Sequence, residues 1–397
     1  MPKVRLTGWL AVLMLLASLL LVACGDNTAT TAPAATSAAA TTAAATTAAA
    51  TTAATATTAA AATTAATTSA SATTAAAGAT NGKKLKVGLV TDVGRVDDKS
   101  FNQSAWEGVQ QAGKELGWEV KFIETKDTKD YAKNIKQFLD DKYDVIVTVG
   151  FLIGDATIDA AKANPNVKFI GVDQFQATTV PNLAGLVFDE DKSGFLAGAL
   201  AAGMSKSGKI AAIVGTKSVP PVVKYAEGYK AGAAYLYDNY AKLVPSGKKP
   251  EVILNYHPDG DNAFNDPTWG ALQAQNVIQS GADVVFGGGG STGNGAVEST
   301  AEKGVYAIGV DTDQYYTLPK AAPKLLSSAM KLLTKGTYDI LKGIASDKFQ
   351  GGNNVGESGL APFHDTDANV PAELKDVLKK IDAGLKDGSI KTGVKVG

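Results

Sequence analysis

The sequence predicts an α/β protein built from two lobes of similar architecture. Short apolar segments alternate with segments of helical periodicity, which is typical of βαβ units and a parallel sheet. The alternation runs through the first half of the region after Lys83 and starts again in the second half. Both halves end in the same tripeptide, Gly171-Val172-Asp173 and Gly309-Val310-Asp311, each directly after an apolar run. A length of 397 residues, at roughly 150 residues per domain, agrees with two units plus appendages.

The first lobe is expected over residues 83–190, together with part of 311–330. It begins with an apolar, strand-like run at 85–91, and a helix of clear periodicity follows at 102–116 until Gly117 ends it. The same criteria predict strands at 119–124, 144–149 and 168–172, and helices at 131–139 and 155–163.

The second lobe is expected over residues 191–310, together with part of 331–397. Residues 193–204 are predicted as the first helix after the chain crosses between the lobes. Strands are expected at 209–214, 251–255, 283–286 and 305–310, and helices at 222–237, 269–279 and 295–302. In the tail we predict a helix at 327–341, a Gly/Asn-rich turn and a surface helix at 372–386.

Composition excludes several classes of function. The formal net charge is −1, so the chain lacks the clustered excess of Lys and Arg expected of a nucleic-acid-binding protein. The sequence holds one cysteine and two histidines, which excludes an internal disulfide and a Cys/His zinc cluster. We expect no metal, no cofactor and no cysteine–histidine catalysis, and we expect a monomer.

The N-terminus carries the pattern of an exported protein. Lys3 and Arg5 precede an apolar run at residues 9–22, and Leu21-Val22-Ala23-Cys24 resembles the lipoprotein box of bacteria. Residues 1–23 are therefore predicted to be a cleaved signal peptide and Cys24 the lipidated first residue of a protein anchored on the extracytoplasmic face of the cell membrane. The alternative is an ordinary secretory signal with an incidental cysteine.

Residues 24–82 are predicted to form a tether between the anchor and the lobes. From 27 to 80 the sequence is almost entirely Ala and Thr, with no apolar face to bury. A flexible coil of this length would reach about 40 Å. A Thr-rich stalk is also compatible with O-linked sugar.

Three aspartates end strands of the predicted sheets. Asp92 follows the first strand of the first lobe, and Asp173 and Asp311 close the two repeated tripeptides. Ligands of open α/β sheets bind outside the carboxyl ends of the strands, so these side chains are expected at a shared cleft. Ionised carboxylates only accept hydrogen bonds, and the hydroxyl and N–H groups of a sugar or nucleoside would supply donors. The alternative is that each aspartate caps a helix or ends a turn.

Two phenylalanines stand among polar residues, where a core side chain is not expected. Phe101 lies in Ser100-Phe101-Asn102 and Phe264 precedes Asn265. Rings from opposite lobes could sandwich a planar base, at about 1–3 kcal/mol per stack. Each could equally be a hydrophobic staple beside a helix start.

A glycine-rich segment supports a rival hypothesis, a nicotinamide-dependent enzyme. Residues 287–293 read Gly-Gly-Gly-Gly-Ser-Thr-Gly, a G-x-G-x-x-G pattern between a strand and a helix, with Asp311 about twenty residues later. Its late position, the export signal and the lack of a paired acid and base weaken that hypothesis, and a flexible turn also explains the glycines. Asp97-Asp98 is interpreted as a solvated approach to a helix. By its sequence alone, Lys331 is interpreted as a surface lysine on a helix.

From Lys84 onwards the sequence resembles the basic membrane protein family of bacterial lipoproteins, which includes purine nucleoside receptors of ABC transporters. The matching stretches are residues 92–108, 171–173, 220–232, 264–267, 287–295 and 309–313. The resemblance implies a type I periplasmic-binding-protein fold, with two lobes joined by three crossovers, and a role in binding rather than catalysis. It implies an ABC permease with its ATPase as partners; a sensory receptor and a nucleoside-processing enzyme remain the alternatives.

The resemblance also implies a role for each candidate residue. Phe101 and Phe264 would stack on the two faces of a purine. Asp92, Asn102 and Asp173 would bind or position the base. The ribose hydroxyls would be held by Asp311, by Lys331 and by backbone near Gly287 and Gly289.

Overall fold

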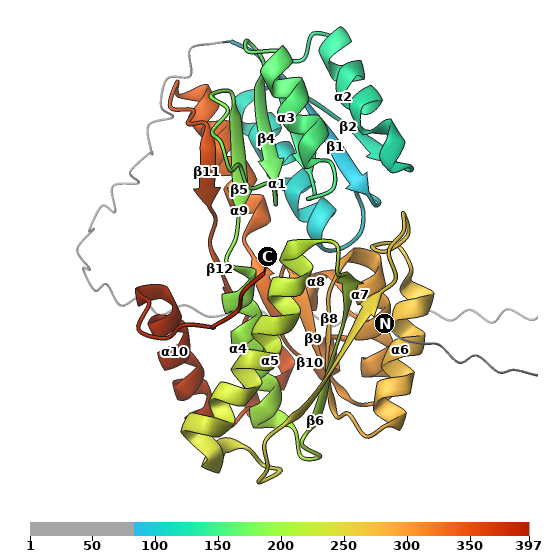
Figure 1. Cartoon of the computed structure of the whole chain (residues 1–397), viewed down its shortest axis with the longest axis vertical. Helices are drawn as coiled ribbons and strands as arrows, with labels where there is room; N and C mark the ends of the chain where they lie inside the picture. Colours follow the sequence, from blue (N-terminus) through green and yellow to red (C-terminus); the bar gives the residue numbers. More distant parts are fainter. Residues whose placement is uncertain (1–82, 397) are drawn as a thin grey trace, which may run out of the picture. The chain divides into compact units, whose positions relative to one another are not determined.

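The computed structural model describes residues 83–396 (Figure 1). All of them fall within one compact unit of the chain. The predicted signal peptide, Cys24 and the tether lie outside the described residues. Within 83–396, no helix is both long enough and apolar enough to cross a bilayer.

The first sheet is parallel throughout and has the strand order β11-β5-β4-β3-β1-β2. Its strands are β1 (Lys86–Val93), β2 (Glu119–Thr125), β3 (Val145–Val149), β4 (Lys168–Val172), β5 (Leu183–Val187) and β11 (Gly352–Val355). β1, β3 and β4 are buried almost throughout, as expected for parallel strands covered on both faces.

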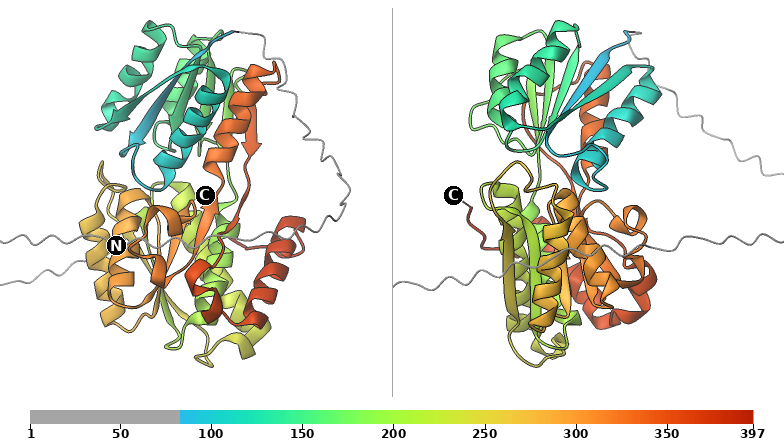
Figure 2. Two further views of the ribbon diagram at one scale, coloured as in Figure 1. Left: turned by 180° about the vertical axis from the view of Figure 1, so that it is seen from behind. Right: turned by 90° about the vertical axis from the view of Figure 1, so that its right-hand side faces the viewer.

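Helices cover both faces of this sheet (Figures 1 and 2). α1 (Phe101–Leu116) and α9 (Leu333–Ala345) pack together on one face, and α2 (Tyr131–Asp140) and α3 (Gly154–Ala163) cover the other. α1 ends at Gly117, which is left-handed and whose N–H bonds the Gly113 carbonyl, a common helix stop. A short 3-10 turn (Thr128–Asp130) precedes α2.

The second sheet repeats this arrangement with the strand order β12-β10-β9-β8-β6-β7. Its strands are β6 (Lys209–Thr216), β7 (Glu251–His257), β8 (Val284–Gly287), β9 (Tyr306–Asp311), β10 (Leu325–Lys331) and β12 (Ser358–Leu360). β12 is the antiparallel member, paired with β10. Its helices are α4 (Glu190–Met204), α5 (Pro220–Tyr240), α6 (Pro267–Gln279), α7 (Gly290–Glu302), α8 (Gln314–Thr317) and α10 (Ala372–Asp387). Short 3-10 turns lie at Ala241–Leu243, Ala322–Lys324 and His364–Asn369.

The chain passes between the two sheets three times, at residues 187–190, 331–333 and 355–358. The first lobe therefore comprises residues 83–187 and 333–355, and the second comprises 190–331 and 358–396. Figure 2 lets the reader follow these connections from behind and from the side. The predicted two-lobed α/β fold is confirmed, and the crossovers match what the resemblance implied.

α4 and α5 approach each other unusually closely, because glycines line both helices. A Cβ atom on Gly198 would lie 1.8 Å from the Tyr229 carbonyl oxygen, and one on Gly232 would lie 1.8 Å from the Phe195 carbonyl oxygen. α4 is buried along almost its whole length, which explains why its sequence lacks a polar face.

The tail differs from the prediction. Residues 327–341 are not one helix: β10 ends at Lys331, and α9 begins at Leu333. β10 pairs in parallel with β9 in the second sheet, so the assignment of part of 311–330 to the first lobe is wrong. α9 and β11 belong to the first lobe instead.

Two further elements of the tail were misjudged. The Gly/Asn-rich segment forms β11, because it pairs with the edge of β5, and such pairing overrides a weak strand propensity. α10 is a helix as predicted, but Leu374, Val377 and Ile381 are buried in the core against α4. β5 was not predicted at all.

Candidate functional site

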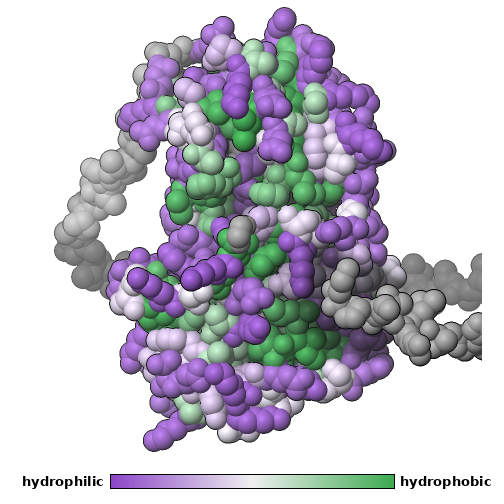
Figure 3. Space-filling view, viewed as in Figure 1, coloured by the Kyte–Doolittle hydropathy of each residue, from purple (hydrophilic) through white to green (hydrophobic). Residues whose placement is uncertain are grey.

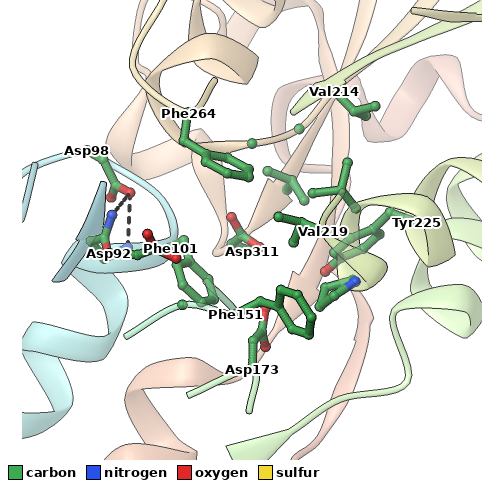
Figure 4. A pocket seen from close by; sticks show the side chains of 18 of the residues that line it. Asp92, Asp98, Phe101, Phe151, Asp173, Val214, Val219, Tyr225, Phe264 and Asp311 are labelled. Carbon is green, nitrogen blue, oxygen red and sulfur yellow. Dashed lines mark hydrogen bonds between the residues drawn. The ribbon is translucent and has the colours of Figure 1, made fainter. Parts of the chain in front are cut away.

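A cavity lies between the carboxyl ends of the two sheets. Its empty space is about 680 Å³, which includes the part that opens to solvent. Side chains from both lobes line it (Figure 4), among them Asp92, Asp98, Phe101, Asn102, Phe151, Asp173, Tyr225, Phe264, Asp311 and Lys331.

The strand order explains why the cavity forms there. Both sheets contain the doubly wound order 2-1-3-4-5, in which the chain reverses direction between two neighbouring strands. In the first lobe the reversal lies between β1 and β3, and Asp92 and Gly150 stand at or just beyond their ends. In the second it lies between β6 and β8, and Gly215 and Gly288 take the corresponding places. Helices diverge at such points and leave a crevice.

Phe101 and Phe264 reach the cavity from different lobes (Figure 4). Phe101 is the first residue of α1, and Phe264 lies in the loop between β7 and α6. The Phe264 ring packs on glycine backbone: a Cβ on Gly215 would lie 2.4 Å from its Cε1 atom, and one on Gly289 would lie 3.4 Å from its Cδ1 atom. Gly215 is therefore required for the ring to lie where it does, whereas a Cβ at Gly289 would only touch the ring.

Asp92 is held by its own lobe. Its Oδ1 accepts the Val93 N–H at 2.6 Å and the Tyr131 hydroxyl, and its Oδ2 accepts the Leu152 N–H at 2.9 Å. Burial raises the pKa of this carboxyl, and these hydrogen bonds oppose the rise. The side chain therefore ties together the loops after β1 and β3 as well as lining the cavity.

Asp98 and Asn102 form a buried pair at the start of α1. Asp98 Oδ2 accepts both the backbone N–H and the side-chain Nδ2–H of Asn102, each at 3.0 Å. Burial raises the pKa of Asp98 to about 6, although backbone hydrogen bonds at the helix start lower it. The interpretation of Asp98 as a solvated residue was wrong: it is 4% exposed, whereas the side chain of Asp97 is 62% exposed.

Lys331 is a buried cation at the boundary between the lobes. Its ammonium group pairs with Asp173 of the first lobe and lies 3.6 Å from Glu190 of the second. It also lies 4.9 Å from the centre of the Phe101 ring. Burial alone would lower the pKa of Lys331, but Asp173, Glu190 and Asp311 outweigh it and hold the pKa above its ordinary value. The interpretation as a surface lysine on a helix was wrong: Lys331 ends β10 and is 3% exposed.

Asp173 and Asp311 occupy equivalent positions in the two lobes. Both have a left-handed backbone, with φ of 60° and 66°, which Asp tolerates better than most residues. Burial raises the pKa of both carboxyls, and Lys331 opposes the rise. Asp311 Oδ2 accepts the Ser100 hydroxyl of the first lobe at 2.7 Å.

Further hydrogen bonds join the lobes beside the cavity. Asn294 Nδ2 donates to the Asp98 carbonyl at 2.6 Å. The Lys99 carbonyl accepts from Gln314 Nε2 at 3.4 Å and from Thr317 Oγ1 at 2.9 Å. We call this set of contacts the latch. It joins the loop before α1 to the second lobe, so the lobes are closed on each other in this structure.

The candidate residues from the sequence therefore converge, with one exception. Asp92, Phe101, Asn102, Asp173, Phe264, Gly289, Asp311 and Lys331 all line the cavity. Gly287 does not: a Cβ there would lie 2.6 Å from the Gly293 carbonyl oxygen, so it serves the packing of β8 on α7. Gly288 and Gly290 line the cavity in its place.

Sequence reasoning missed several members of the site. Asp98, Phe151 and Tyr225 line the cavity and Glu190 lies beside Lys331, but the sequence singled out none of them as a ligand contact. Phe151 lies two residues after β3, and this position close to the end of a buried strand could have indicated it. Glu190 became visible only when folding brought the start of α4 beside Lys331.

The site offers acceptors and flat apolar surfaces. Among the described residues, no group of three or more His, Cys, Asp or Glu side chains could hold a metal ion. Two buried acceptors that belong to lining residues, Asn102 Oδ1 and Asp173 Oδ1, have no hydrogen-bond partner. Such atoms are costly unless a guest supplies a donor.

Comparison with known proteins places this fold and site in context. Residues 85–357 match the Bmp family model, described as ABC transporter substrate-binding protein PnrA-like. The chain is 33% identical over 338 residues to the ABC transporter nucleoside-binding protein BmpA of Lactococcus lactis subsp. cremoris, covering 78% of this chain and 90% of the relative. It is 31% identical over 282 residues to an uncharacterized lipoprotein of Pyrococcus abyssi, covering 69% and 67%.

Solved structures agree on the fold. A solute-binding protein of an ABC transporter system from Aeropyrum pernix K1 superimposes with a TM-score of 0.69 at 23% identity, covering 77% of this chain and 92% of that one. Another from Conexibacter woesei gives a TM-score of 0.59 at 21% identity, covering 77% and 98%.

Proposed function

The chain belongs to the Bmp family of PnrA-like ABC transporter substrate-binding proteins, and from this premise we propose that it captures a nucleoside, with a purine base preferred, and delivers it to an ABC importer. The family is one of binding proteins rather than enzymes. The permease and its ATPase are the partners that such a protein implies. A relative at 33% identity is named as nucleoside-binding, which supports this class of guest.

The observation that carries the proposal is the pair of unpartnered buried acceptors beside two aromatic rings. Asn102 Oδ1 and Asp173 Oδ1 need donors, and Phe101 and Phe264 offer faces for a flat ring. A nucleobase provides both, since each base has a π face and most carry N–H groups. Asp92 then positions the loops that hold the base.

Asp311 and Lys331 would hold the ribose. An ionised carboxylate can accept both hydroxyls of a vicinal diol, and an ammonium group can donate to a hydroxyl oxygen. A buried carboxylate built for hydroxyls should discriminate strongly against a deoxy sugar, because it is left unpaired. Gly288 and Gly289 allow the backbone to approach the sugar closely.

The charge of the cavity favours a neutral guest. Among the described residues that line it, four carboxylates (Asp92, Asp98, Asp173 and Asp311) face one ammonium group, that of Lys331. α5 begins with Pro220 and Pro221, which lack the N–H groups that bind anions at helix starts. Asp98 already occupies the start of α1. A nucleoside therefore suits the site better than a nucleotide.

Capture would proceed by closure of the lobes. A nucleoside binds one half-site in the open protein, and rotation about the three crossovers brings the second half-site over it. Water leaves, and hydrogen bonds strengthen in the dry cavity. The latch forms at the same time and stabilises the closed state.

The anchor belongs to the same proposal. A diacylated or triacylated Cys24 would hold the protein on the extracytoplasmic face of the membrane, where it meets its permease. The name of the Pyrococcus abyssi relative, a lipoprotein, supports this location.

Titration calorimetry tests the proposal on protein refolded to remove bound guests. Inosine, guanosine, adenosine, cytidine, free ribose, free base and a nucleoside monophosphate form the panel. We expect purine ribonucleosides to bind at micromolar Kd or tighter, about −8 kcal/mol, with the monophosphate at least tenfold weaker. Turnover of any nucleoside, or binding of none, would refute the proposal.

A further inference from the structure

Asp98 is a buried carboxylate whose oxygens are both fully engaged. Oδ1 accepts the N–H groups of Ser100 and Gln103, each at 3.0 Å. Oδ2 accepts the N–H of Asn102 and its side-chain Nδ2–H, also at 3.0 Å. Dashed lines in Figure 4 mark hydrogen bonds that the labelled Asp98 accepts. The carboxylate thus fixes the backbone at the start of α1 and one end of the Asn102 amide together.

The chemistry of the pair determines which end of the amide it holds. An ionised carboxylate can only accept a hydrogen bond, so the NH₂ end of Asn102 must face Asp98. The carbonyl end is left over, and Asn102 Oδ1 is a buried atom without a partner in a residue that lines the cavity. The subsite therefore presents an acceptor rather than a donor.

The second lobe holds Asp98 in this position. Its backbone carbonyl accepts Asn294 Nδ2–H at 2.6 Å. α7 begins at Gly290, where a Cβ atom would lie 3.5 Å from Asp98 Oδ2. A helix start next to a carboxylate favours its ionised form. Asn294 bonds the backbone of Asp98, so the Asn102 amide itself is held by the Asp98 carboxylate within the first lobe.

We propose that Asp98 is a positioning residue that locks Asn102 as a hydrogen-bond acceptor, so that the base subsite selects a base whose edge carries an N–H donor. This inference rests on the proposed nucleoside function and specifies which bases the same cavity accepts. Hypoxanthine and guanine carry N1–H and adenine carries an exocyclic NH₂. The unsubstituted purine ring of purine riboside presents acceptor nitrogens alone and leaves Asn102 Oδ1 unpaired.

The test compares inosine with purine riboside in the wild type and in Asp98→Asn. In the wild type we expect inosine to bind at least about tenfold more tightly than purine riboside, because a tenfold change in Kd corresponds to the free energy of about one buried hydrogen bond. In Asp98→Asn, the introduced NH₂ can take the place of Oδ2 and donate to the Asn102 carbonyl, at the expense of the bond from the Asn102 backbone N–H, and so permits the reversed orientation of the Asn102 amide. The preference for inosine should therefore fall by about tenfold in this variant. The introduced side chain keeps an oxygen that can accept the N–H groups of Ser100 and Gln103, so the helix should survive.

Asp97→Asn is the matched control, because Asp97 is its exposed neighbour and pairs with Arg95 on the surface. It should leave both affinities unchanged. If Asp98→Asn does not fold, as judged by circular dichroism, Asn102→Ala replaces it and should likewise abolish the preference for inosine.

The outcomes distinguish a failure of the proposed nucleoside-binding function from a failure of the positioning role of Asp98. If the wild type binds neither nucleoside, nor any other ribonucleoside, the proposed function fails. If the wild type binds inosine but Asp98→Asn lowers the affinity for inosine and for purine riboside by the same factor, Asp98 only holds the start of α1 and the positioning role is refuted. An unchanged preference in Asn102→Ala would refute it as well.

Discussion

Removing one hydrogen bond of the latch should weaken ligand binding without weakening the lobes. Asn294→Ala deletes the amide that donates to the Asp98 carbonyl across the cleft at 2.6 Å. In the open protein that carbonyl can be hydrated, whereas in the closed protein it would be buried without a donor. The free-energy cost of the unpaired carbonyl therefore destabilises the closed state and not the open one.

The size of the effect follows from the cost of one buried, unpaired group. That cost is about 1–3 kcal/mol, which corresponds to an increase in Kd of about five- to hundredfold. The increase should appear mainly in the dissociation rate. It should be the same for every nucleoside, because Asn294 is not among the residues that line the cavity.

Asn182→Ala is the matched control. Asn182 is also buried, and its Nδ2 donates to the carbonyls of Ala161, Asn164 and Val167 within the first lobe. This variant should lower the melting temperature and leave Kd unchanged. Calorimetry and stopped-flow fluorescence measure affinity and dissociation, and thermal unfolding measures stability.

Two results would contradict this reasoning. If Asn294→Ala binds nucleosides with the wild-type Kd, the latch does not form on closure. If the loss of affinity in Asn294→Ala differs between nucleosides, Asn294 acts on the bound nucleoside rather than on the closure of the lobes.

Three other predictions concern the cavity itself. Asp311→Asn should raise the Kd of ribonucleosides about ten- to hundredfold by calorimetry, because a charge-assisted hydrogen bond becomes neutral. The Kd of 2′-deoxynucleosides should rise less. Equal increases for both would show that Asp311 does not bind the ribose. Lys331→Met should lower the free energy of unfolding by about 3–5 kcal/mol in urea at pH 8, since it leaves buried carboxylates uncompensated. The pKa values of Asp173, Glu190 and Asp311 are raised, so these carboxyls become protonated and neutral as the pH falls. The difference in free energy of unfolding between the wild type and Lys331→Met should therefore shrink towards pH 4. A difference that does not change with pH would refute the charge argument. Phe264→Ala should cost about 1–3 kcal/mol of stacking, measured as a five- to hundredfold rise in the Kd of purine nucleosides, and an unchanged Kd would exclude the sandwich.

Much of the fold could be predicted because the parallel strands are buried on both faces. Runs such as β3 and β4 are mostly apolar, and the helices between the strands keep their periodicity. β5 and β11 escaped prediction because glycine, alanine or asparagine interrupts their apolar pattern, and both owe their form to pairing with a neighbour. The same cause explains β10, whose small residues Ser327, Ser328 and Ala329 fit beside β9 but carry no strand signal.

The candidate site was predictable where residues follow strands. Asp92, Asp173 and Asp311 could be found from their positions after apolar runs, and they do line one cavity. Asp98 and Glu190 could not, because their burial comes from contacts between segments far apart in the sequence. Acidic residues are usually exposed, so sequence alone favours the solvated interpretation.

Figure 3 shows hydrophilic side chains spread over the visible face of the lobes, with apolar areas between them. The strongest concentration of buried charge lies instead around Lys331, in the cavity between the lobes.

A crystal structure of the protein with inosine tests the central claim most directly. The account predicts the base between the rings of Phe101 and Phe264, an N–H group bonded to Asn102 Oδ1, and the ribose hydroxyls on Asp311. Inosine bound outside this cavity, or in it with the ribose turned away from Asp311, would contradict the account.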